Sequence, residues 1–233
     1  MKAARLALLN PASNYEMTAR NFQRELDADI AQFQIQDGQL PKSDDFDGCV
    51  VTGSRASVYW DEEWIPPLKS WVGDAIEGGL PFLGVCFGHQ LLADVLGGTV
   101  EDMGEYEIGY RDVTHENDDP LFDGIDDRFT AFMTHSDRVV EIPPGAMRIA
   151  SNDYGVHGFR KGSVVGVQFH PEYDMETARL VTQDKDELPE SVRESVLEGI
   201  TADNYAAACQ AKIVFDNFVD SLEQQRPTPS PAD

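Results

Sequence analysis

Short apolar runs alternate with amphipathic stretches through the N-terminal half of the chain. Four apolar runs have the length of buried strands, and three stretches between them have helical spacing (strands at 4–9, 28–35, 46–53 and 81–86; helices at 15–27, 61–79 and 88–98). The helix expected over 61–79 begins with acidic residues, which suit the positive end of its dipole. Strand and helix in alternation predict an α/β fold with an open, mostly parallel sheet flanked by helices.

From about residue 99 the pattern changes to strands without helices between them. The apolar segments lie at 107–113, 129–133, 138–142, 146–151, 155–159 and 163–169. They predict an antiparallel extension of the same sheet, or a small subsidiary sheet. A charged, exposed excursion is expected at 184–200, and a closing helix at 204–222. The pattern indicates a single domain over 1–222, followed by a proline-rich, polar tail at 223–233 that is predicted to be disordered.

The composition indicates a protein that needs no disulfide bond or structural metal ion for stability. With 41% hydrophobic residues in 233, the chain can bury a full core. Its three cysteines form no C-x-x-C pair, which argues against a disulfide framework or a zinc site and suits a reducing compartment. Asn10-Pro11 interrupts the N-terminal apolar run, so no signal peptide or membrane span is expected. We expect a soluble, cytoplasmic protein.

The charge balance is strongly acidic. Asp and Glu total 42 against 18 Lys and Arg, which gives a net charge of −24. Such a surface repels nucleic acids and anionic membranes, so neither is expected as a partner. Only six of the basic residues are lysines. An acidic, lysine-poor chain favours a halophilic protein from a high-salt cytoplasm; the alternative is an acidic protein from an ordinary cell.

The stretch LPFLGVCFGHQLLADVLGG, at 80–98, places Cys86 where an apolar strand ends and a helix begins. This order is typical of a nucleophile elbow, whose strained tip needs small neighbours such as Gly84 and Gly88. The positive end of the following helix favours a thiolate, and the Phe87 amide can donate to an oxyanion. The alternative is a buried structural cysteine.

A base and an orienting acid are offered by VVGVQFHPEY, at 164–173. Strand residues at i and i+2 share a side, so His170 and Glu172 would project together if extended geometry persists through Pro171. The glutamate can fix the imidazole while the imidazole takes the thiol proton. For His170 and Glu172 in isolation, a surface pair would be the better interpretation. Together with the elbow, a Cys-His-Glu triad is the better one. The turn at Gly53-Ser54 is placed where a second oxyanion donor is needed, although, taken alone, an ordinary strand-to-loop turn is the preferred interpretation.

These three stretches, in this order, resemble the class I (triad) glutamine amidotransferase family. GVCFGHQ matches the family's G-x-C-x-G-x-Q elbow at every fixed position, and QFHPE, at 168–172, matches its triad segment letter for letter. The resemblance covers about residues 45–175. It implies an open, flavodoxin-like α/β sheet with the elbow at its centre.

The resemblance also implies a reaction. Cys86 would attack the side-chain amide of glutamine, His170 would move the proton with Glu172 behind it, and a γ-glutamyl thioester would release ammonia and then glutamate. Gly53 and Phe87 would supply the oxyanion amides. MTHSDRV, at 133–139, is similar to the family's M-S-H-G-D segment, with Ser136 in place of the glycine. Four residues are therefore expected at the substrate: Gln90, Ser54, His135 and Ser136. The family needs no cofactor or metal for this step.

The remaining histidines are given no catalytic role. His89 is expected to face the helix surface or a partner, and His115 and His157 are interpreted as structural or solvated.

The acceptor of the ammonia stays open. The chain is too short for a synthetase domain and has no Gly-rich ATP loop, and its motifs are similar to those of the glutaminase subunit of GMP synthase, so a synthetase partner is expected. The long, aromatic segment TGSRASVYWDEEWIPPL looks more like stand-alone amidotransferase-like proteins. The alternative is therefore a γ-glutamyl peptidase or hydrolase with the same triad. A non-catalytic module is disfavoured by the complete triad, and cysteine hydrolases with His after the nucleophile are disfavoured by Phe87.

Overall fold

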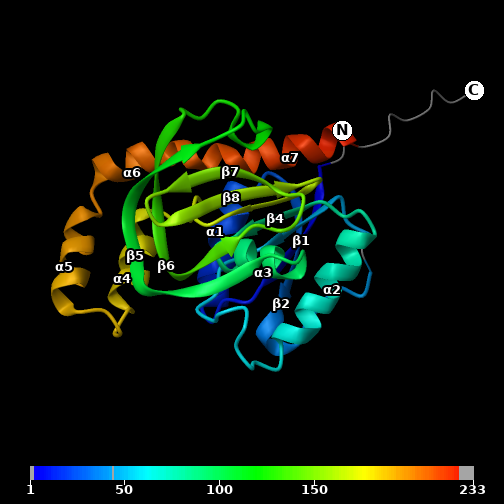
Figure 1. Ribbon diagram of the computed structural model, residues 1–233, viewed down its shortest axis with the longest axis horizontal. Helices are drawn as coiled ribbons and strands as arrows, with labels where there is room; N and C mark the ends of the chain where they lie inside the picture. The colour runs from blue at the N-terminus through cyan, green and yellow to red at the C-terminus, as the bar shows by residue number, and fades with distance from the viewer. Residues whose placement is uncertain (1–2, 44, 226–233) are drawn as a thin grey trace, which may run out of the picture.

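A nine-stranded sheet runs through the molecule in the order β2-β1-β3-β4-β9-β8-β7-β5-β6 (Figure 1). The computed structural model describes residues 3–43 and 45–225. Its strands are β1 (Arg5–Asn10), β2 (Asp29–Gln34), β3 (Gly48–Val51), β4 (Phe82–Val85), β5 (Thr99–His115), β6 (Arg128–Glu141), β7 (Met147–Asn152), β8 (Gly155–Lys161) and β9 (Val164–Val167). Its helices are α1 (Tyr15–Glu25), α2 (Ile65–Glu77), α3 (Phe87–Val95), α4 (Met175–Gln183), α5 (Glu190–Gly199), α6 (Ala202–Ala208) and α7 (Ile213–Gln225), with short 3-10 turns at 35–37, 120–122 and 209–212.

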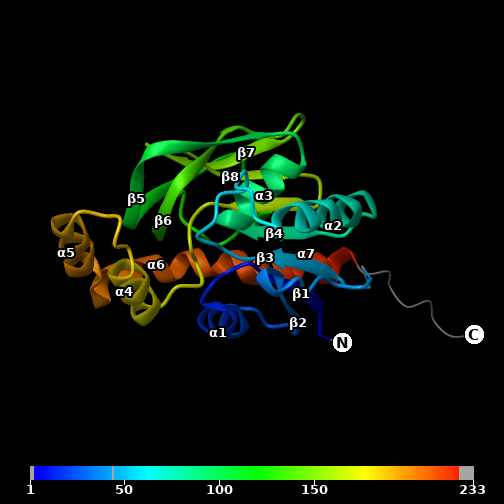
Figure 2. The ribbon, with the colours of Figure 1, turned by 90° about the horizontal axis from the view of Figure 1, so that it is seen from below.

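Five strands, β2, β1, β3, β4 and β9, form the parallel half of the sheet. Alternate residues of a strand face opposite sides, and each side is covered by its own helices. Leu8 of β1 lies in one core cluster with α1 and α7, whereas Leu9 lies in the other with α2 and α3. Figure 2 shows these two helix layers on either side of the sheet. The predicted open α/β sheet is confirmed.

The strands after residue 99 extend the same sheet. β9 pairs with β8, β8 with β7, β7 with β5 and β5 with β6, all antiparallel. The region is therefore an extension of the main sheet and not a separate one. The segments expected as two strands at 129–133 and 138–142 belong to one long strand, β6.

Two helix predictions need correction. The helix expected from residue 61 begins at Ile65, with two prolines in its first turn, so the acidic residues at 61–63 precede it and do not meet its dipole. The closing helix is two helices, α6 and α7, joined by a 3-10 turn. α7 reaches Gln225, so residues 223–225 of the predicted disordered tail are helical, and the rest of that tail lies outside the described residues.

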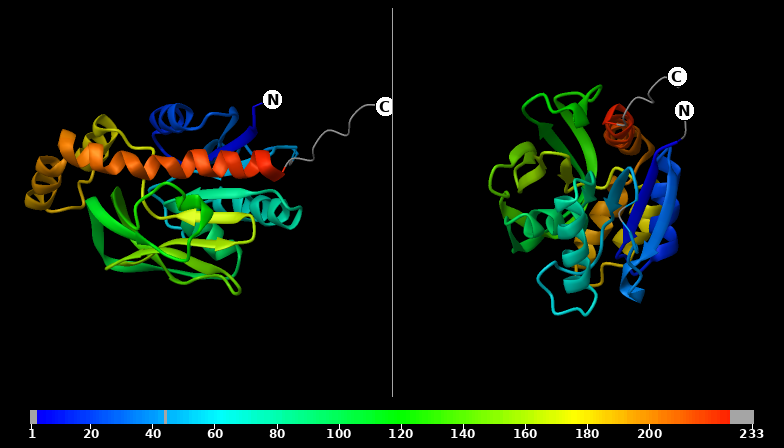
Figure 3. Two further views of the ribbon diagram at one scale, coloured as in Figure 1. Left: turned by 90° about the horizontal axis from the view of Figure 1, so that it is seen from above. Right: turned by 90° about the vertical axis from the view of Figure 1, so that its right-hand side faces the viewer.

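The charged excursion at 184–200 contains α5, which has no buried residue. α4 and α5 lie at one end of the molecule, and the end of α7 lies beside the start of β1 at the other (Figure 3). Within the described residues, no helix has both the length and the apolar character needed to cross a lipid bilayer.

Candidate active site

Cys86 occupies the tip of the turn between β4 and α3. Its φ of 53° is a left-handed value that an L-residue adopts only under constraint. A Cβ on Gly84 would collide with the main chain of Gly88, and a Cβ on Gly88 would collide with the carbonyl of Val51. Only glycine therefore allows α3 to approach β4 and β3 this closely. The predicted strand, turn and helix are confirmed.

The surroundings of Cys86 suit an anionic tetrahedral species. Cys86 is 5% exposed and borders a cavity of about 460 Å3. Phe87 is the first residue of α3, so its N–H has no acceptor within the helix. Gly53 lies against the same point, because a Cβ there would be 2.9 Å from Cε1 of His170 and 3.7 Å from Cβ of Cys86. Both expected oxyanion donors are thus beside the cysteine.

His170 and Glu172 meet beside Cys86, 4% and 1% exposed. Nδ1 of His170 lies 2.8 Å from Oε1 of Glu172, and the Tyr173 ring stacks on the imidazole with centroids 4.2 Å apart. Nε2 of His170 has no hydrogen-bond partner in the part of the chain that the structure describes. The fixed ring therefore presents one unoccupied nitrogen at the border of the cavity that Cys86 also borders.

The pair does not arise from strand geometry. β9 ends at Val167, so extended backbone does not continue through Pro171 as the sequence interpretation required. Arg24 of α1 fixes the segment instead, since its guanidinium donates to the main-chain oxygen of Glu172 at 2.6 Å and to the carboxylate of Asp174 at 2.7 Å.

The charge of the pair favours a protonated imidazole. Burial alone would lower the pKa of His170, but the Glu172 carboxylate and the nearby Cys86 outweigh burial and raise the pKa to about 10. At neutral pH the ring is then an imidazolium that can give a proton to a leaving nitrogen.

A second, smaller cavity of about 240 Å3 meets Cys86 from the side of α3 and β6. Gln90 and Ser136 line it, and Nε2 of Gln90 donates to the main-chain oxygen of Asp137 at 3.1 Å and to Oε1 of Gln168 at 3.0 Å. Thr134 was missed by the sequence analysis. Its hydroxyl is buried, has no hydrogen-bond partner in the described ranges and borders both cavities.

Ser54 also borders both cavities, but its hydroxyl already donates to the main-chain oxygen of Pro11 at 2.9 Å. It accepts in turn from the N–H of Ala56 at 3.2 Å. The Ser54 side chain therefore shapes the loop that follows β3.

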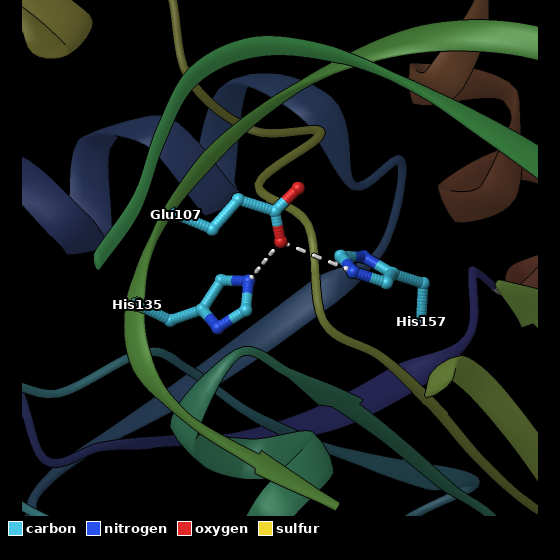
Figure 4. Close-up of side chains that lie close together, drawn as sticks. All are labelled: Glu107, His135 and His157. Carbon is cyan, nitrogen blue, oxygen red and sulfur yellow. Dashed lines mark hydrogen bonds and ion pairs between the residues drawn. The ribbon is translucent and has the colours of Figure 1, made fainter. Parts of the chain in front are cut away.

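The His135 side chain lies in a buried cluster with Glu107 and His157 (Figure 4). Oε2 of Glu107 lies 2.8 Å from Nε2 of His135 and 3.2 Å from Nε2 of His157. Nδ1 of His135 lies 2.9 Å from the main-chain oxygen of Asp137, and Asn152 donates to Oε1 of Glu107 at 2.6 Å. The cluster ties β6 to β5, β7 and β8 directly behind the smaller cavity.

Both acceptors of His135 are oxygens, so each of its nitrogens must carry a hydrogen for both contacts to be hydrogen bonds. Burial would raise the pKa of Glu107, but the hydrogen bonds and charges of His135 and His157 lower it to about 2. Burial lowers the pKa of His157. The cluster is therefore organised as a carboxylate held by N–H donors.

The same three residues, Glu107, His135 and His157, are the one group in the described ranges with the side chains and spacing of a metal site. Zinc accepts this ligand set at about 2.0–2.2 Å from each donor atom. In the structure Oε2 of Glu107 contacts both imidazoles at hydrogen-bond distances, and the three side chains form a hydrogen-bonded network.

Two further residues differ in environment from the nucleophile. His89 is fully buried against the Phe159 ring, with centroids 5.1 Å apart, and does not face a surface as expected. Burial, followed by the charge of His157, lowers the pKa of His89 to about 3. Cys49 lies inside β3, where burial raises its thiol pKa well above the usual value. Neither residue borders the two cavities at Cys86.

An α/β sheet with a cysteine elbow and a buried His–Glu pair at its centre defines the class of molecule. The family model of class I glutamine amidotransferases matches residues 10–185. The chain belongs to the class I glutamine amidotransferase family.

Known relatives and structures agree with this assignment. Residues of the chain are 41% identical over 128 positions to a GMP synthase (glutamine-hydrolyzing) of Thermomicrobium roseum and 40% identical over 128 positions to that of Clostridium novyi. The match covers 54% of this chain in both cases but only 23% and 24% of those proteins, so the chain spans about a quarter of the curated relatives it matches.

Two solved structures share the fold. The crystal structure of a glutamine amidotransferase from Thermotoga maritima has a TM-score of 0.79 at 24% identity, covering 94% of this chain and all of that one. The glutamine amidotransferase of Methylobacillus flagellatus has a TM-score of 0.78 at 19% identity, with both chains covered completely.

Proposed function

We propose that the protein hydrolyses the side-chain amide of glutamine through a thioester on Cys86. The observation that carries this proposal is the position of Cys86. It lies at positive φ at the elbow, beside a His170 whose Nδ1 is held by Glu172 and whose Nε2 has no partner in the described residues.

The proposed reaction uses the chain's own groups at each step. Sγ of Cys86 attacks the amide carbon as a thiolate whose proton is held by His170, and the N–H groups of Gly53 and Phe87 stabilise the oxyanion. The C–N bond breaks as His170 gives its proton to the leaving nitrogen, and ammonia departs. A water molecule then gives a proton to His170, attacks the thioester and releases glutamate and Cys86. Glu172 keeps the imidazole oriented throughout.

The amino-acid end of glutamine fits the smaller cavity. Gln90 and the main chain around Ser136 line it, and Thr134 adds an unpaired hydroxyl at its junction with Cys86. Ser54 contributes through its loop. His135 contributes through its backbone, because its ring contacts Glu107 and the Asp137 carbonyl oxygen.

Ammonia from this site would serve a synthetase. The curated relatives are GMP synthases that hydrolyse glutamine, and this supports a GMP synthase-like partner that receives the ammonia. Neither nucleic acid nor a membrane is part of the proposal, given the net charge of −24.

A γ-glutamyl hydrolase is the second candidate function. It would use the same thioester with a larger leaving group. The observation that favours it is the larger cavity at Cys86, on the side of His170, which has more room than ammonia requires.

The cellular compartment and the domain organisation of the protein are also proposals. All three cysteines are free, which supports a reducing cytoplasm, and the excess of acidic residues supports a high-salt one. One sheet with helices on both faces over the described residues supports a single domain that ends near residue 222.

The test is glutamine hydrolysis in high-salt buffer by wild type and three cysteine variants. Cys86→Ala should abolish ammonia release, whereas Cys49→Ala and Cys209→Ala should retain it. Acid quenching of the wild type during turnover should trap a γ-glutamyl adduct on Cys86, visible by mass spectrometry. The adduct detects the chemistry even if turnover is slow without a partner. Wild-type activity in Cys86→Ala would contradict the proposal.

A further inference from the structure

Two cavities meet at Cys86. The smaller one, about 240 Å3, extends along Gln90, Ser136 and Asp137. The larger one, about 460 Å3, extends past His170 between α1 and α4. Cys86, Ser54 and Thr134 border both, so the reacting carbon can lie at the junction with a substrate arm in each direction.

The chemistry decides which arm of the substrate enters which cavity. His170 must reach the leaving nitrogen in order to protonate it, so the leaving group lies on the side of its Nε2. His170, Glu172 and Tyr173 border the larger cavity and are absent from the smaller one. The γ-glutamyl arm therefore takes the smaller cavity, and the leaving group faces the larger one.

The larger cavity has far more room than ammonia needs. A molecule of the size of water occupies roughly 30 Å3 in a liquid, and the cavity measures about 460 Å3. An ammonia molecule released there would make contacts on one side only. A leaving group with several carbon atoms would instead touch both helices.

The lining of the cavity indicates what such a leaving group would look like. Its walls include apolar side chains from α1, from α4 and from the loops that precede each of them: Ala12, Met17, Tyr173, Leu180 and Val181. Leu180 is 47% exposed, which is unusual for a large apolar side chain that faces a cavity beside a nucleophile.

Arg55 and Lys185 border both cavities, and each is already paired. Arg55 contacts the Asp184 carboxylate at 2.9 Å, and Lys185 donates to the Tyr106 hydroxyl at 2.7 Å with Glu187 at 3.6 Å. A leaving group with a carboxylate would have to displace one of these partners. An uncharged, apolar leaving group needs no such change.

We propose that the larger cavity is a leaving-group subsite, and that the protein cleaves γ-glutamyl amides of primary amines that carry an apolar side chain. The inference rests on the proposed thioester chemistry. Sγ of Cys86 bonds to the side-chain carbonyl carbon of the γ-glutamyl group, the C–N bond at that carbon breaks, the proton of His170 passes to nitrogen and the free amine leaves through the subsite. Water then hydrolyses the thioester to glutamate.

The experiment compares four substrates in high-salt buffer: glutamine, γ-glutamyl methylamide, γ-glutamyl 3-methylbutylamide and γ-glutamyl glutamate. Released glutamate or amine gives kcat/KM for wild type, Cys86→Ala, Leu180→Asp and Val192→Asp. Val192 is the matched control, because it is an apolar residue, 39% exposed, on α5 and outside both cavities.

In wild type, kcat/KM for the 3-methylbutylamide should exceed that for the methylamide by about tenfold, since the added carbons enter an apolar but half-open site. The kcat/KM for γ-glutamyl glutamate should be lower than that for the 3-methylbutylamide, because its leaving group carries carboxylates. Leu180→Asp should bring the ratio of the two alkylamides close to one, and Val192→Asp should leave that ratio unchanged.

The two ways to fail are distinct. Glutamine hydrolysis that depends on Cys86, together with an alkylamide ratio near one or a ratio that Leu180→Asp does not change, would overturn the subsite and leave the glutaminase proposal standing. Absence of both turnover and a Cys86 adduct with all four substrates would overturn the glutaminase proposal and the subsite together.

Discussion

Two buried histidine–glutamate pairs lie near Cys86, and they differ in what remains unpaired. His170 and Glu172 both border the larger cavity, whereas only His135 of the pair with Glu107 borders the smaller one. In the pair of His170 and Glu172, Nε2 of the histidine has no partner in the described residues. In the pair of His135 and Glu107, both histidine nitrogens contact oxygens and both carboxylate oxygens accept from the protein. The two pairs are similarly buried, but only the first has a histidine nitrogen that is free to bind or protonate a ligand.

The comparison distinguishes a histidine that can take part in the reaction from one that holds neighbouring groups in position. A histidine held at one nitrogen and unpaired at the other can move a proton, whereas a histidine held at both can only fix what surrounds it. Asp137 shows the second role, since its main-chain oxygen accepts from both His135 and Gln90. We infer that Glu107 is a positioning residue for the wall of the smaller cavity.

The largest effect on activity is expected for a substitution in the pair of His170 and Glu172. His170→Gln keeps a polar side chain of similar size but cannot transfer a proton, so kcat/KM for glutamine should fall by about a thousandfold or more. Steady-state ammonia release measures it, and a melting curve shows whether the variant stays folded. A folded variant with activity within about tenfold of wild type would remove His170 from the mechanism.

Glu172→Gln should have the next largest effect. The charge that raises the pKa of His170 to about 10 would be lost, and burial would then lower that pKa. The imidazolium would lose its proton at a lower pH, so the alkaline limb of the activity profile should shift to lower pH and kcat should fall by about a hundredfold. An unchanged pH profile would contradict the assignment of Glu172.

The sequence was informative where the chemistry is local. Cys86 with its glycines, and His170 with Glu172, lie within two short stretches, and both stretches reach the same site. The distance between the two stretches is set by the parallel pairing of β4 with β9, which the sequence analysis did not predict, because it placed the strand at 163–169 in the antiparallel region.

The second pair could not be found in this way. Glu107, His135 and His157 come from three strands, and the first two are separated by 28 positions. The polar residues at 134–137 interrupt the apolar pattern of β6 and were interpreted as a break between strands. They continue the strand because their polar groups are buried against Glu107, Gln90 and Tyr59. A single strand with a polar centre is recognisable only once its partners are known.

Glu107→Gln tests the pair of His135 and Glu107. Loss of the carboxylate removes the charged acceptor of both histidines and should loosen the wall that binds the amino-acid end of glutamine. We expect KM to rise by about tenfold, with kcat within about twofold of wild type, as for an interaction made equally in ground and transition states. Glu101→Gln, on an exposed position of the same strand, is the control and should change neither value. A fall in kcat at constant KM would place Glu107 in the chemistry instead.

The smallest effect is on stability, and it depends on pH. The folded protein lowers the pKa of Glu107 from 4.5 to about 2, so its carboxylate stabilises the fold fully above about pH 4.5 and loses this contribution as the pH falls through about 2. Wild type should therefore melt several degrees above Glu107→Gln at pH 7, and the difference should shrink steadily below pH 4.5, whereas Glu101→Gln should follow wild type throughout. A difference that stays constant down to the acid limit of folding would mean that the glutamate acts by its shape and not by its charge. In that case the contrast between the two pairs would lie in hydrogen-bond availability alone.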